Sequence, residues 1–459
     1  MISNQEFLVK DIPSTDSLRS KILNYRQREK LLDKWLVKRL DSILPQVMKE
    51  AGIDCWVLIN NEYNEDPIFW TLTTYSQITA RRLTIMVFRL NKDGSVSRYS
   101  VTRYPMDNYK QLWNDQSISQ MKTLADTIRS WKVNKIGLNF SDDFAYADGL
   151  SYSLYRDFVK ELDEEEKAKI VSAENIVVGW LETRSEEEMV AYNDIVQIAH
   201  TKIAEAYSNK VIHPGVTSAD DVKYWMMQKT TDLGLEPWFD YEVSITRNGK
   251  EHYEGDEIIM PGDMLHCDVG FRYLNLCTDT QELCYILKAD ELDVPDDLKE
   301  AMKVTNRLQD IVVENMILGR SGNEILKASI EQAKKEGIRP CIYTHPLGFH
   351  GHAAGPTIGL WDHQEGVEGS GDYPLHDNTA YSLELNATVY SKTYGCDIRM
   401  AMESDILLKD GKVYFLAGRQ ENFHVVKYSN IIKSPLTAGF LKHITGFLDL
   451  RMLKSFLYV

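Results

Sequence analysis

The chain has 459 residues, enough for two or three domains at roughly 150 residues each. Its 68 acidic and 52 basic side chains leave a formal net charge of −16, which argues against nucleic acid or an anionic membrane as the main partner. Apolar residues make up 43%, and no stretch reaches the roughly 18 apolar residues of a membrane span, so we expect a soluble globular protein.

The first 180 residues predict one α/β domain. They begin with MISNQEFLVKDIP, which lacks the basic and apolar regions of a signal peptide, and the six cysteines of the chain form no CxxC pair, so we expect a cytoplasmic protein. Residues 22–51 carry apolar side chains at helical spacing and predict an amphipathic helix that ends near Gly52. Strand-like runs follow at 55–59, 83–88 and 96–101, and a helix precedes another run at 135–139.

Residues 184–427 predict a second domain, which gives the chain an α+β fold. Ser185 caps a helix that has three glutamates in its first turn and runs to about residue 209. A second helix spans 216–232, capped by Thr217 or Ser218. Strands dominate 238–287, residues 296–336 are helical, and 342–408 hold strands with long loops, so two helices precede each of two strand-rich blocks, as in a duplicated α+β half.

The last residues, 428–459, form a C-terminal tail whose role the sequence does not indicate. Residues 440–448 within it have the pattern of an amphipathic helix. Such a helix can bind a membrane surface, but we expect it to pack on a partner subunit or on its own domain.

Two aspartates in strand-like sequence, Asp268 and Asp279, are the first candidates for a functional site. A chain reversal around residues 273–274 would place them opposite each other on one face of a hairpin, where facing positions sum to 547. Two carboxylates within about 5 Å repel each other unless a cation or a shared proton compensates. Taken alone, the pair also fits solvated aspartates beside a turn.

Histidines form the second group of candidates. The segment THPLGFHGH holds His345, His350 and His352, and His363 follows in WDH. Imidazole is both a common metal ligand and a proton carrier near neutral pH. Read alone, these histidines could instead be hydrogen-bonded within a glycine-rich loop, and His252 could be an ordinary surface residue.

Two glutamates in apolar strand sequence, Glu384 and Glu403, complete the candidates. A glutamate is seldom fully buried unless it is paired or binds a cation, although each could instead lie on an edge strand. Together with the two aspartates they carry a charge of −4, which balances two divalent cations. A site rich in carboxylates and poor in imidazole suits Mn(II), Co(II) or Zn(II).

The order and spacing of these candidates resemble the ligand set of the pita-bread metallopeptidases, family M24: Asp268, Asp279, one histidine of residues 345–352, Glu384 and Glu403. The family includes methionine aminopeptidase, aminopeptidase P, prolidase and creatinase. The resemblance covers residues 184–427, and the domain before them resembles that of the aminopeptidase P, prolidase and creatinase branch. It implies an N-terminal creatinase-like α/β domain followed by a pita-bread catalytic domain.

The resemblance also implies roles for the ligands. Asp268 would bind one metal ion and the histidine the other, with Asp279 and Glu403 bridging the two. Glu384 would be both a ligand and the acid-base group that moves the proton of the attacking water.

The histidines are assigned less directly, because the family's run of His-x-x-Gly-His-x-x-Gly is altered here. We favour His350 as the metal ligand, with His345 and His352 as alternatives. His252 and His363 match the two outer histidines that steady the scissile carbonyl.

The resemblance implies a metallopeptidase that hydrolyses a peptide bond, expected to be an Xaa-Pro bond, near the N-terminus of its substrate. It also implies two divalent metal ions, with manganese as the first choice, and a homo-oligomer, expected to be a dimer. Ala401 replaces an arginine that is common two positions before Glu403, and Arg399 could stand in from a neighbouring turn. Three alternatives remain: a creatinase-like hydrolase of a small non-peptide substrate, a catalytically silent binding module on the same fold, and candidate side chains that never meet in space.

Overall fold

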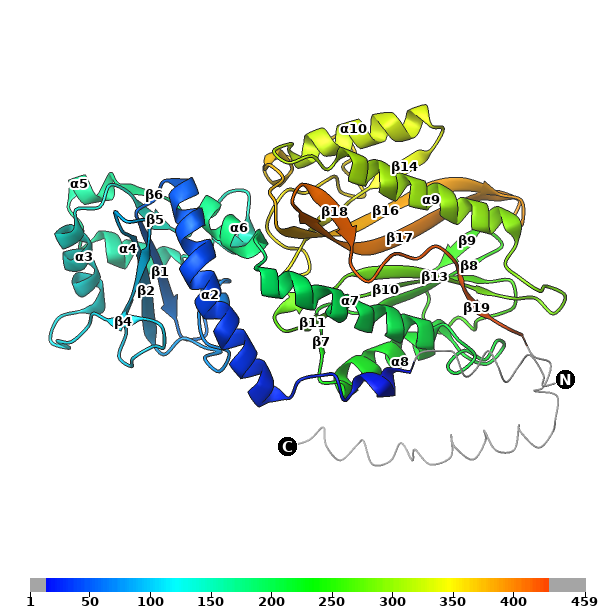
Figure 1. Ribbon diagram of the computed structural model, residues 1–459, viewed down its shortest axis with the longest axis horizontal. Helices are drawn as coiled ribbons and strands as arrows, with labels where there is room; N and C mark the ends of the chain where they lie inside the picture. Colours follow the sequence, from blue (N-terminus) through cyan, green and yellow to red (C-terminus); the bar gives the residue numbers. More distant parts are fainter. Residues whose placement is uncertain (1–13, 429–459) are drawn as a thin grey trace.

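The computed structural model describes residues 14–428 and has two lobes, each built around its own β-sheet (Figure 1). The N-terminal lobe holds a six-stranded sheet of order β4-β3-β2-β1-β5-β6, and the C-terminal lobe holds a ten-stranded sheet and a three-stranded one. These mixed helices and sheets confirm the predicted α+β class. Within residues 14–428 we find no helix long and apolar enough to cross a membrane. The helix predicted at 440–448 lies outside the described residues.

The N-terminal lobe alternates helices and strands. The short helix η1 (Thr15–Leu18) lies with the C-terminal lobe, where Thr15 donates to Glu205 at 2.7 Å (Figure 1). The elements of the N-terminal lobe are α2 (Tyr25–Ala51), β1 (Cys55–Asn61), η2 (Phe69–Thr71), β2 (Leu83–Leu90), β3 (Val96–Val101), β4 (Lys110–Gln111), α3 (Gln120–Trp131), β5 (Ile136–Leu138), η3 (Ala145–Ala147), α4 (Tyr152–Val159), α5 (Glu164–Lys167), β6 (Ile170–Ser172) and α6 (Glu174–Glu182).

Helix α2 confirms the amphipathic helix predicted for residues 22–51. Asn24 and Gln27 form a capping box at its start, and Gly52 ends it in the left-handed region at φ 63°, where glycine avoids the strain of a side chain. Its apolar face, which includes Leu40 and Leu44, packs in one core cluster with Trp56 of β1 and with α6. The helix therefore joins the N-terminal sheet to the segment that leads into the second lobe.

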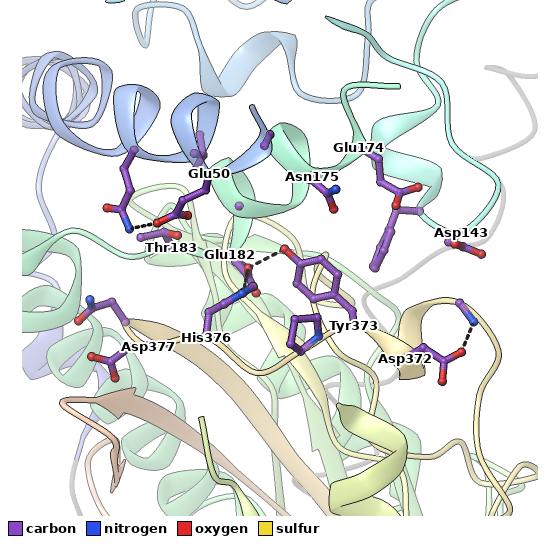
Figure 2. A pocket seen from close by; sticks show the side chains of 18 residues that line it. Glu50, Asp143, Glu174, Asn175, Glu182, Thr183, Asp372, Tyr373, His376 and Asp377 are labelled. Carbon is purple, nitrogen blue, oxygen red and sulfur yellow. Dashed lines mark hydrogen bonds and ion pairs between the residues drawn. The ribbon is translucent and has the colours of Figure 1, made fainter. Parts of the chain in front are cut away.

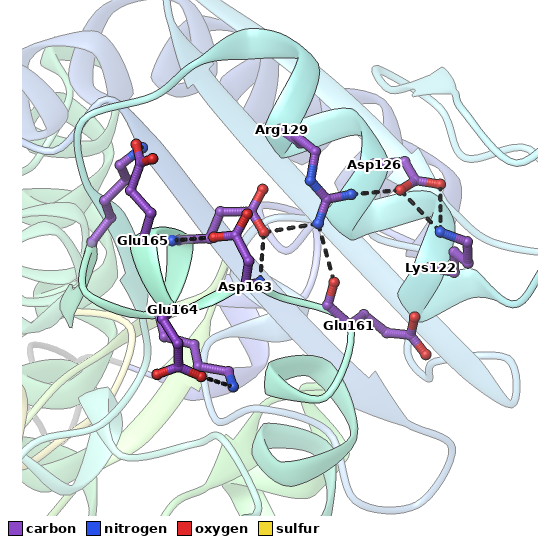
Figure 3. A network of polar contacts seen from close by, with 10 residues as sticks. Lys122, Asp126, Arg129, Glu161, Asp163, Glu164 and Glu165 are labelled. Carbon is purple, nitrogen blue, oxygen red and sulfur yellow. Dashed lines mark hydrogen bonds and ion pairs between the residues drawn. The ribbon is translucent and has the colours of Figure 1, made fainter.

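A network of charged side chains orders the outer surface of the N-terminal lobe (Figure 3). Arg129 of α3 donates to Asp126 at 2.7 Å and to Glu166 of α5 at 2.8 Å, and Lys122 donates to Asp126 at 3.1 Å. Ion pairs that solvent reaches contribute little to stability. The network thus links two helices without indicating a functional site.

The C-terminal lobe contains four long helices and most of the strands. Its elements are α7 (Glu186–Ala206), α8 (Ala219–Asp232), β7 (Glu236–Pro237), β8 (Glu242–Arg247), β9 (Lys250–His252), β10 (Met264–Val269), β11 (Phe271–Tyr273), β12 (Leu276–Cys277), β13 (Thr280–Ile286), α9 (Asp296–Asn315), α10 (Gly322–Lys335), β14 (Arg339–Ile342), β15 (His345–Leu347), η4 (Ser370–Asp372), β16 (Thr379–Ser391), β17 (Cys396–Lys409), β18 (Lys412–Phe415) and β19 (His424–Val426).

The helices of this lobe cover one face of its large sheet. Helices α7 and α8 pack on apolar side chains of β8 and β10, and α9 and α10 pack on those of β16 and β17. The order of two helices before each strand-rich block agrees with the prediction of two α+β halves. Ser185 caps α7 through a capping box with Glu188, and Ser218 rather than Thr217 caps α8.

The hairpin that carries the two aspartates has a different register from the predicted one. Tyr273 lies opposite Leu276, so facing positions sum to 549 rather than 547. The reversal occurs at Leu274 and Asn275, which have φ of 52° and 61°. Two positive φ angles in a two-residue turn normally favour glycine or asparagine, and a leucine there hides the turn in the sequence. Asp268 therefore faces Gln281, not Asp279.

Candidate metal centre

Five polar residues form one row across five neighbouring strands of the large sheet. Asp268 of β10 lies between Glu242 of β8 and Gln281 of β13, and Gln281 lies opposite Glu403 of β17, which lies opposite Glu384 of β16. Directly opposed residues point to the same face of a sheet. Pairing across the sheet thus brings three predicted ligands together on the face away from the helices.

Asp279 and His345 lie outside this row, and their side chains approach it from two other segments of the chain. Asp279 lies between β12 and β13, and its backbone N–H donates to Oδ1 of Asp405 at 3.0 Å. His345 begins β15, and its Nε2 lies 3.5 Å from Oδ2 of Asp279, 3.8 Å from Oε1 of Glu403 and 3.9 Å from Oε2 of Glu384. All four predicted carboxylates and one histidine of residues 345–352 therefore converge.

Three overlapping sets of side chains present ligand atoms within 4.8 Å of one another: Asp268, Asp279 and Glu403; His345, Glu384 and Glu403; Asp279, His345 and His352. The sets share members, so they describe one extended cluster rather than three separate ones. A cluster of this extent, with shared carboxylates in its middle, has the arrangement needed to hold two cations side by side.

The cluster contains His345 and not the predicted His350. His350 lies beyond the end of β15, where the chain turns toward the N-terminal lobe. Its ring stacks on Tyr146 with 4.0 Å between ring centroids and meets Trp70 edge-on at 5.6 Å. The predicted ligand His350 therefore lies outside the cluster, because the strand ends before that residue and its ring packs among aromatic side chains of the other lobe.

The remaining histidines differ in their distance from the cluster. The ring of His352 meets that of His345 edge-on at 4.7 Å between centroids. His363 is exposed and bonds Asp362, and His252 lies 4.0 Å from Glu254. Among the described residues, neither His252 nor His363 belongs to the three sets. His352, an alternative in the prediction of the ligand, thus lies at the cluster beside His345.

The protonation of His345 suits a metal ligand. Its Nδ1 lies 3.0 Å from the carbonyl oxygen of Pro346, a contact that requires an N–H at Nδ1 and leaves the lone pair on Nε2. Burial lowers the pKa of His345 to about 3, so the ring is neutral at physiological pH. Nε2 is buried, and among residues 14–428 it has no hydrogen-bond partner.

The four carboxylates are held where ionisation is costly. Burial, and then the charge of neighbouring carboxylates, raises the pKa of Asp268 to about 7 and of Glu384 to about 8. The same causes, in the same order, raise the pKa of Asp279 and of Glu403 well above the ordinary range. Without a cation, the folded protein therefore favours protonated carboxyl groups here.

Unpaired atoms in the cluster fit a divalent cation. Oδ1 of Asp268 and Oε2 of Glu403 are buried and, within the described part of the chain, accept no hydrogen bond, as is also true of Nε2 of His345. Buried polar atoms without partners are rare in folded proteins. Four carboxylates and one imidazole match the donor preference of Mn(II), Co(II) or Zn(II), and two such ions would balance the charge.

Neutral polar residues support the cluster, and the sequence analysis missed them. Ser382 donates to Glu403, and Gln281 donates to Glu384. Gln281 could have been suspected from its position two residues after Asp279, because this spacing puts two side chains on one face of an extended chain. Arg399 lies on β17 itself, not on a neighbouring turn, and bonds the Tyr343 hydroxyl at 3.1 Å.

A second acidic region lies between the lobes (Figure 2). It borders a cavity of about 520 Å³ lined by α2, α6 and residues 369–378. Glu182 at the end of α6 accepts from His376 at 2.8 Å and from the Tyr373 hydroxyl at 3.2 Å. None of the predicted metal ligands lines this cavity, so its contacts join the two lobes rather than form part of the cluster.

Comparison with known proteins agrees with this geometry. Residues 187–410 match the model of Metallopeptidase family M24. No curated protein matches the sequence. Among solved structures, an X-Pro aminopeptidase from Thermotoga maritima MSB8 shares 18% identity over 83% of this chain and 100% of its own, with a TM-score of 0.59.

Two further structures give similar values. An Xaa-Pro dipeptidase from Bacillus anthracis shares 18% identity over 85% of this chain and 99% of its own, with a TM-score of 0.58. The prolidase from Pyrococcus horikoshii OT3 shares 15% identity over 83% of this chain and 99% of its own, with a TM-score of 0.53. Likeness at these identities establishes a common two-lobed fold.

Proposed function

Residues 187–410 belong to metallopeptidase family M24, and from this premise we propose that the chain is a dinuclear metallopeptidase that cleaves an Xaa-Pro bond near the N-terminus of its substrate. The observation that carries the proposal is the convergence of one neutral imidazole and four carboxylates whose free atoms face one another. A silent binding module has no need of all five ligands.

In this proposal each candidate ligand has a defined place. Asp268 would hold one ion and His345 the other, Asp279 and Glu403 would be shared, and Glu384 would complete the histidine side. When bound, two divalent cations acidify a water molecule and stabilise negative charge on the carbonyl oxygen under attack. Manganese is the metal we propose first, with cobalt and zinc as alternatives.

Glu384 would transfer the proton. Its Oε2 lies 3.9 Å from Nε2 of His345, and its Oε1 accepts from Gln281. The carboxylate would take a proton from the attacking water and later give it to the nitrogen of the departing peptide. The proton thus passes from water to the leaving group, and the peptide bond is exchanged for a carboxylate and an amine.

His352 would steady the substrate carbonyl from the side of the cluster that borders His345. The outer roles of His252 and His363 stay predictions, because their rings contact Glu254 and Asp362 instead.

The Xaa-Pro preference rests on likeness to structures described as X-Pro aminopeptidase and Xaa-Pro dipeptidase. A prolyl amide has no N–H, so its pocket must recognise the ring without a hydrogen bond from that nitrogen. A homodimer in the cytoplasm that acts on peptides belongs to the same proposal.

The test combines metal loading with a substrate panel. The manganese-loaded protein is assayed on Gly-Pro, on longer Xaa-Pro peptides and on creatine. We expect peptide turnover, and we expect Glu384→Gln to lower kcat by about 10²–10⁴-fold while the fold and most metal binding remain. Glu242→Gln is the matched control, since Glu242 lies in the same row outside the three sets. Near-native turnover by Glu384→Gln would refute its role, and turnover of creatine alone would refute the peptidase.

A further inference from the structure

Gln281 is the neutral member of the row of five residues that crosses the large sheet. Its side chain is 3% exposed, and in register it lies between Asp268 and Glu403. Its amide Nε2 donates to Oε1 of Glu384 and lies 3.4 Å from Oδ2 of Asp268. One amide group thus contacts ligands from two different strands.

The orientation of this amide is fixed by His266. An ionised carboxylate can only accept hydrogen bonds, so the NH₂ end of Gln281 must face Asp268 and Glu384. Its Oε1 then faces Nε2 of His266 at 2.9 Å, and this contact requires the imidazole to carry its proton on Nε2. His266 thereby opposes rotation of the amide that would turn its oxygen toward two carboxylates.

The contacts of Gln281 occupy one oxygen of each carboxylate and leave the other free. Asp268 keeps Oδ1 without a donor among the described residues, and Glu384 keeps Oε2, which lies 3.9 Å from Nε2 of His345. The two free oxygens are the ones available to cations. We propose that Gln281, oriented by His266, is a positioning residue that aims Asp268 and Glu384 at the metal ions, an inference that rests on the proposed function.

The chemistry of the position favours an amide. A carboxylate at residue 281 would add a fifth negative charge to the row and remove both donors. An apolar side chain would leave the two ligands free to rotate. Groups that orient metal ligands in this way typically change metal affinity or activity by about 10–100-fold when they are removed.

The test compares three variants of the full chain: Gln281→Met, His266→Leu and Gln420→Met. Gln420 is the matched control, because its amide bonds the backbone of Leu283 on the same strand, at 2.8 Å in both directions. Each protein is stripped with chelator, its Tm is recorded, and Mn²⁺ binding is measured by calorimetry. Peptide kinetics then separate kcat from KM.

We expect Gln281→Met to weaken Mn²⁺ binding about 10–100-fold and to lower kcat while KM changes less than about twofold. His266→Leu should lower both the Mn²⁺ affinity and kcat, by a smaller factor. If Gln281→Met does not fold, the result for His266→Leu tests the positioning role. Gln420→Met should keep the wild-type Mn²⁺ affinity.

Affinities of Gln281→Met and His266→Leu within about twofold of wild type would overturn the inference, as would an equal loss in Gln420→Met. Metal binding is read without peptide, so a wild-type protein that binds two Mn²⁺ ions but cleaves no peptide refutes the proposed function alone. A wild-type protein that binds no Mn²⁺ refutes both.

Discussion

The two faces of the large sheet hold carboxylates in opposite ways. On the helix-covered face, Glu282 accepts from His200 of α7 and from His424 of β19. Burial alone would raise its pKa, but the two histidines outweigh it and lower the pKa of Glu282 to about 2. On the other face, burial and mutual repulsion raise the pKa of Asp268 and Glu384 to about 7 and 8.

The difference shows what a buried carboxylate requires. Glu282 has a donor for each oxygen and is a stable anion within the protein. On the opposite face, the residues described (14–428) provide more acceptors than donors, and a bound cation would supply the missing positive charge. The partners of each carboxylate therefore distinguish the two faces: Glu282 is paired within the protein, whereas the opposite face has the properties that the proposed cation site requires.

The largest expected effect on stability comes from removing the contacts of Glu282 with His200 and His424. Glu282→Gln removes the charge that both histidines bind and should lower the free energy of unfolding by about 3–5 kcal/mol, measured by urea denaturation at neutral pH. Glu242→Gln, at an exposed position on the other face, is the control, and it should change stability by under about 1 kcal/mol. A loss below about 1 kcal/mol in Glu282→Gln would contradict the comparison.

The two faces should also respond oppositely to pH. The pKa of Glu282 lies below its ordinary value of 4.5, so its contribution is present above pH 4.5 and is lost as pH falls toward 2. The pKa of Glu384 is raised from 4.5 to about 8, so the metal-free protein loses stability as pH rises through that interval.

The expected slope on the metal-binding face is about −1.4 kcal/mol per pH unit for each proton involved. The loss of stability is followed as the fall of Tm with rising pH in the presence of chelator. Saturating Mn²⁺ should flatten this profile, because the cations replace the protons. A metal-free protein whose Tm does not change between pH 5 and 8 would contradict this account.

A smaller effect of opposite sign to that of Glu282→Gln is expected for Glu403→Gln. In chelator this variant removes one repelling carboxylate and should raise the free energy of unfolding by about 1 kcal/mol or more. In Mn²⁺ it should lose much of the stabilisation that the metal gives the wild-type protein. Destabilisation by Glu403→Gln in chelator would show that its carboxylate is already satisfied.

The sequence predicts much of this fold because helix signals are local. The cap at Ser185 and the stop at Gly52 can be recognised from neighbouring residues alone. The hairpin register was missed because Leu274 occupies a turn position with positive φ, where its side chain gives no signal.

The four carboxylates of the cluster could be predicted because their order and spacing along the chain resemble those of the family's ligand set, although each of them alone is a weak signal. The choice between His345 and His350 depended on where β15 ends, and this is a matter of tertiary packing. The roles of Gln281, His266 and Ser382 depend on which strands lie side by side. The residue type of a neutral polar side chain in a strand does not indicate which residues will lie opposite it.

The central claim is that His345 and four carboxylates hold two metal ions, and a matched pair of variants tests it most directly. Mn²⁺ binding is measured by calorimetry for wild type, His345→Ala and His350→Ala. We expect two ions per chain in wild type, at least a tenfold loss of affinity for one ion in His345→Ala, and affinities within about threefold of wild type in His350→Ala. Intact binding in His345→Ala together with loss in His350→Ala would contradict the account.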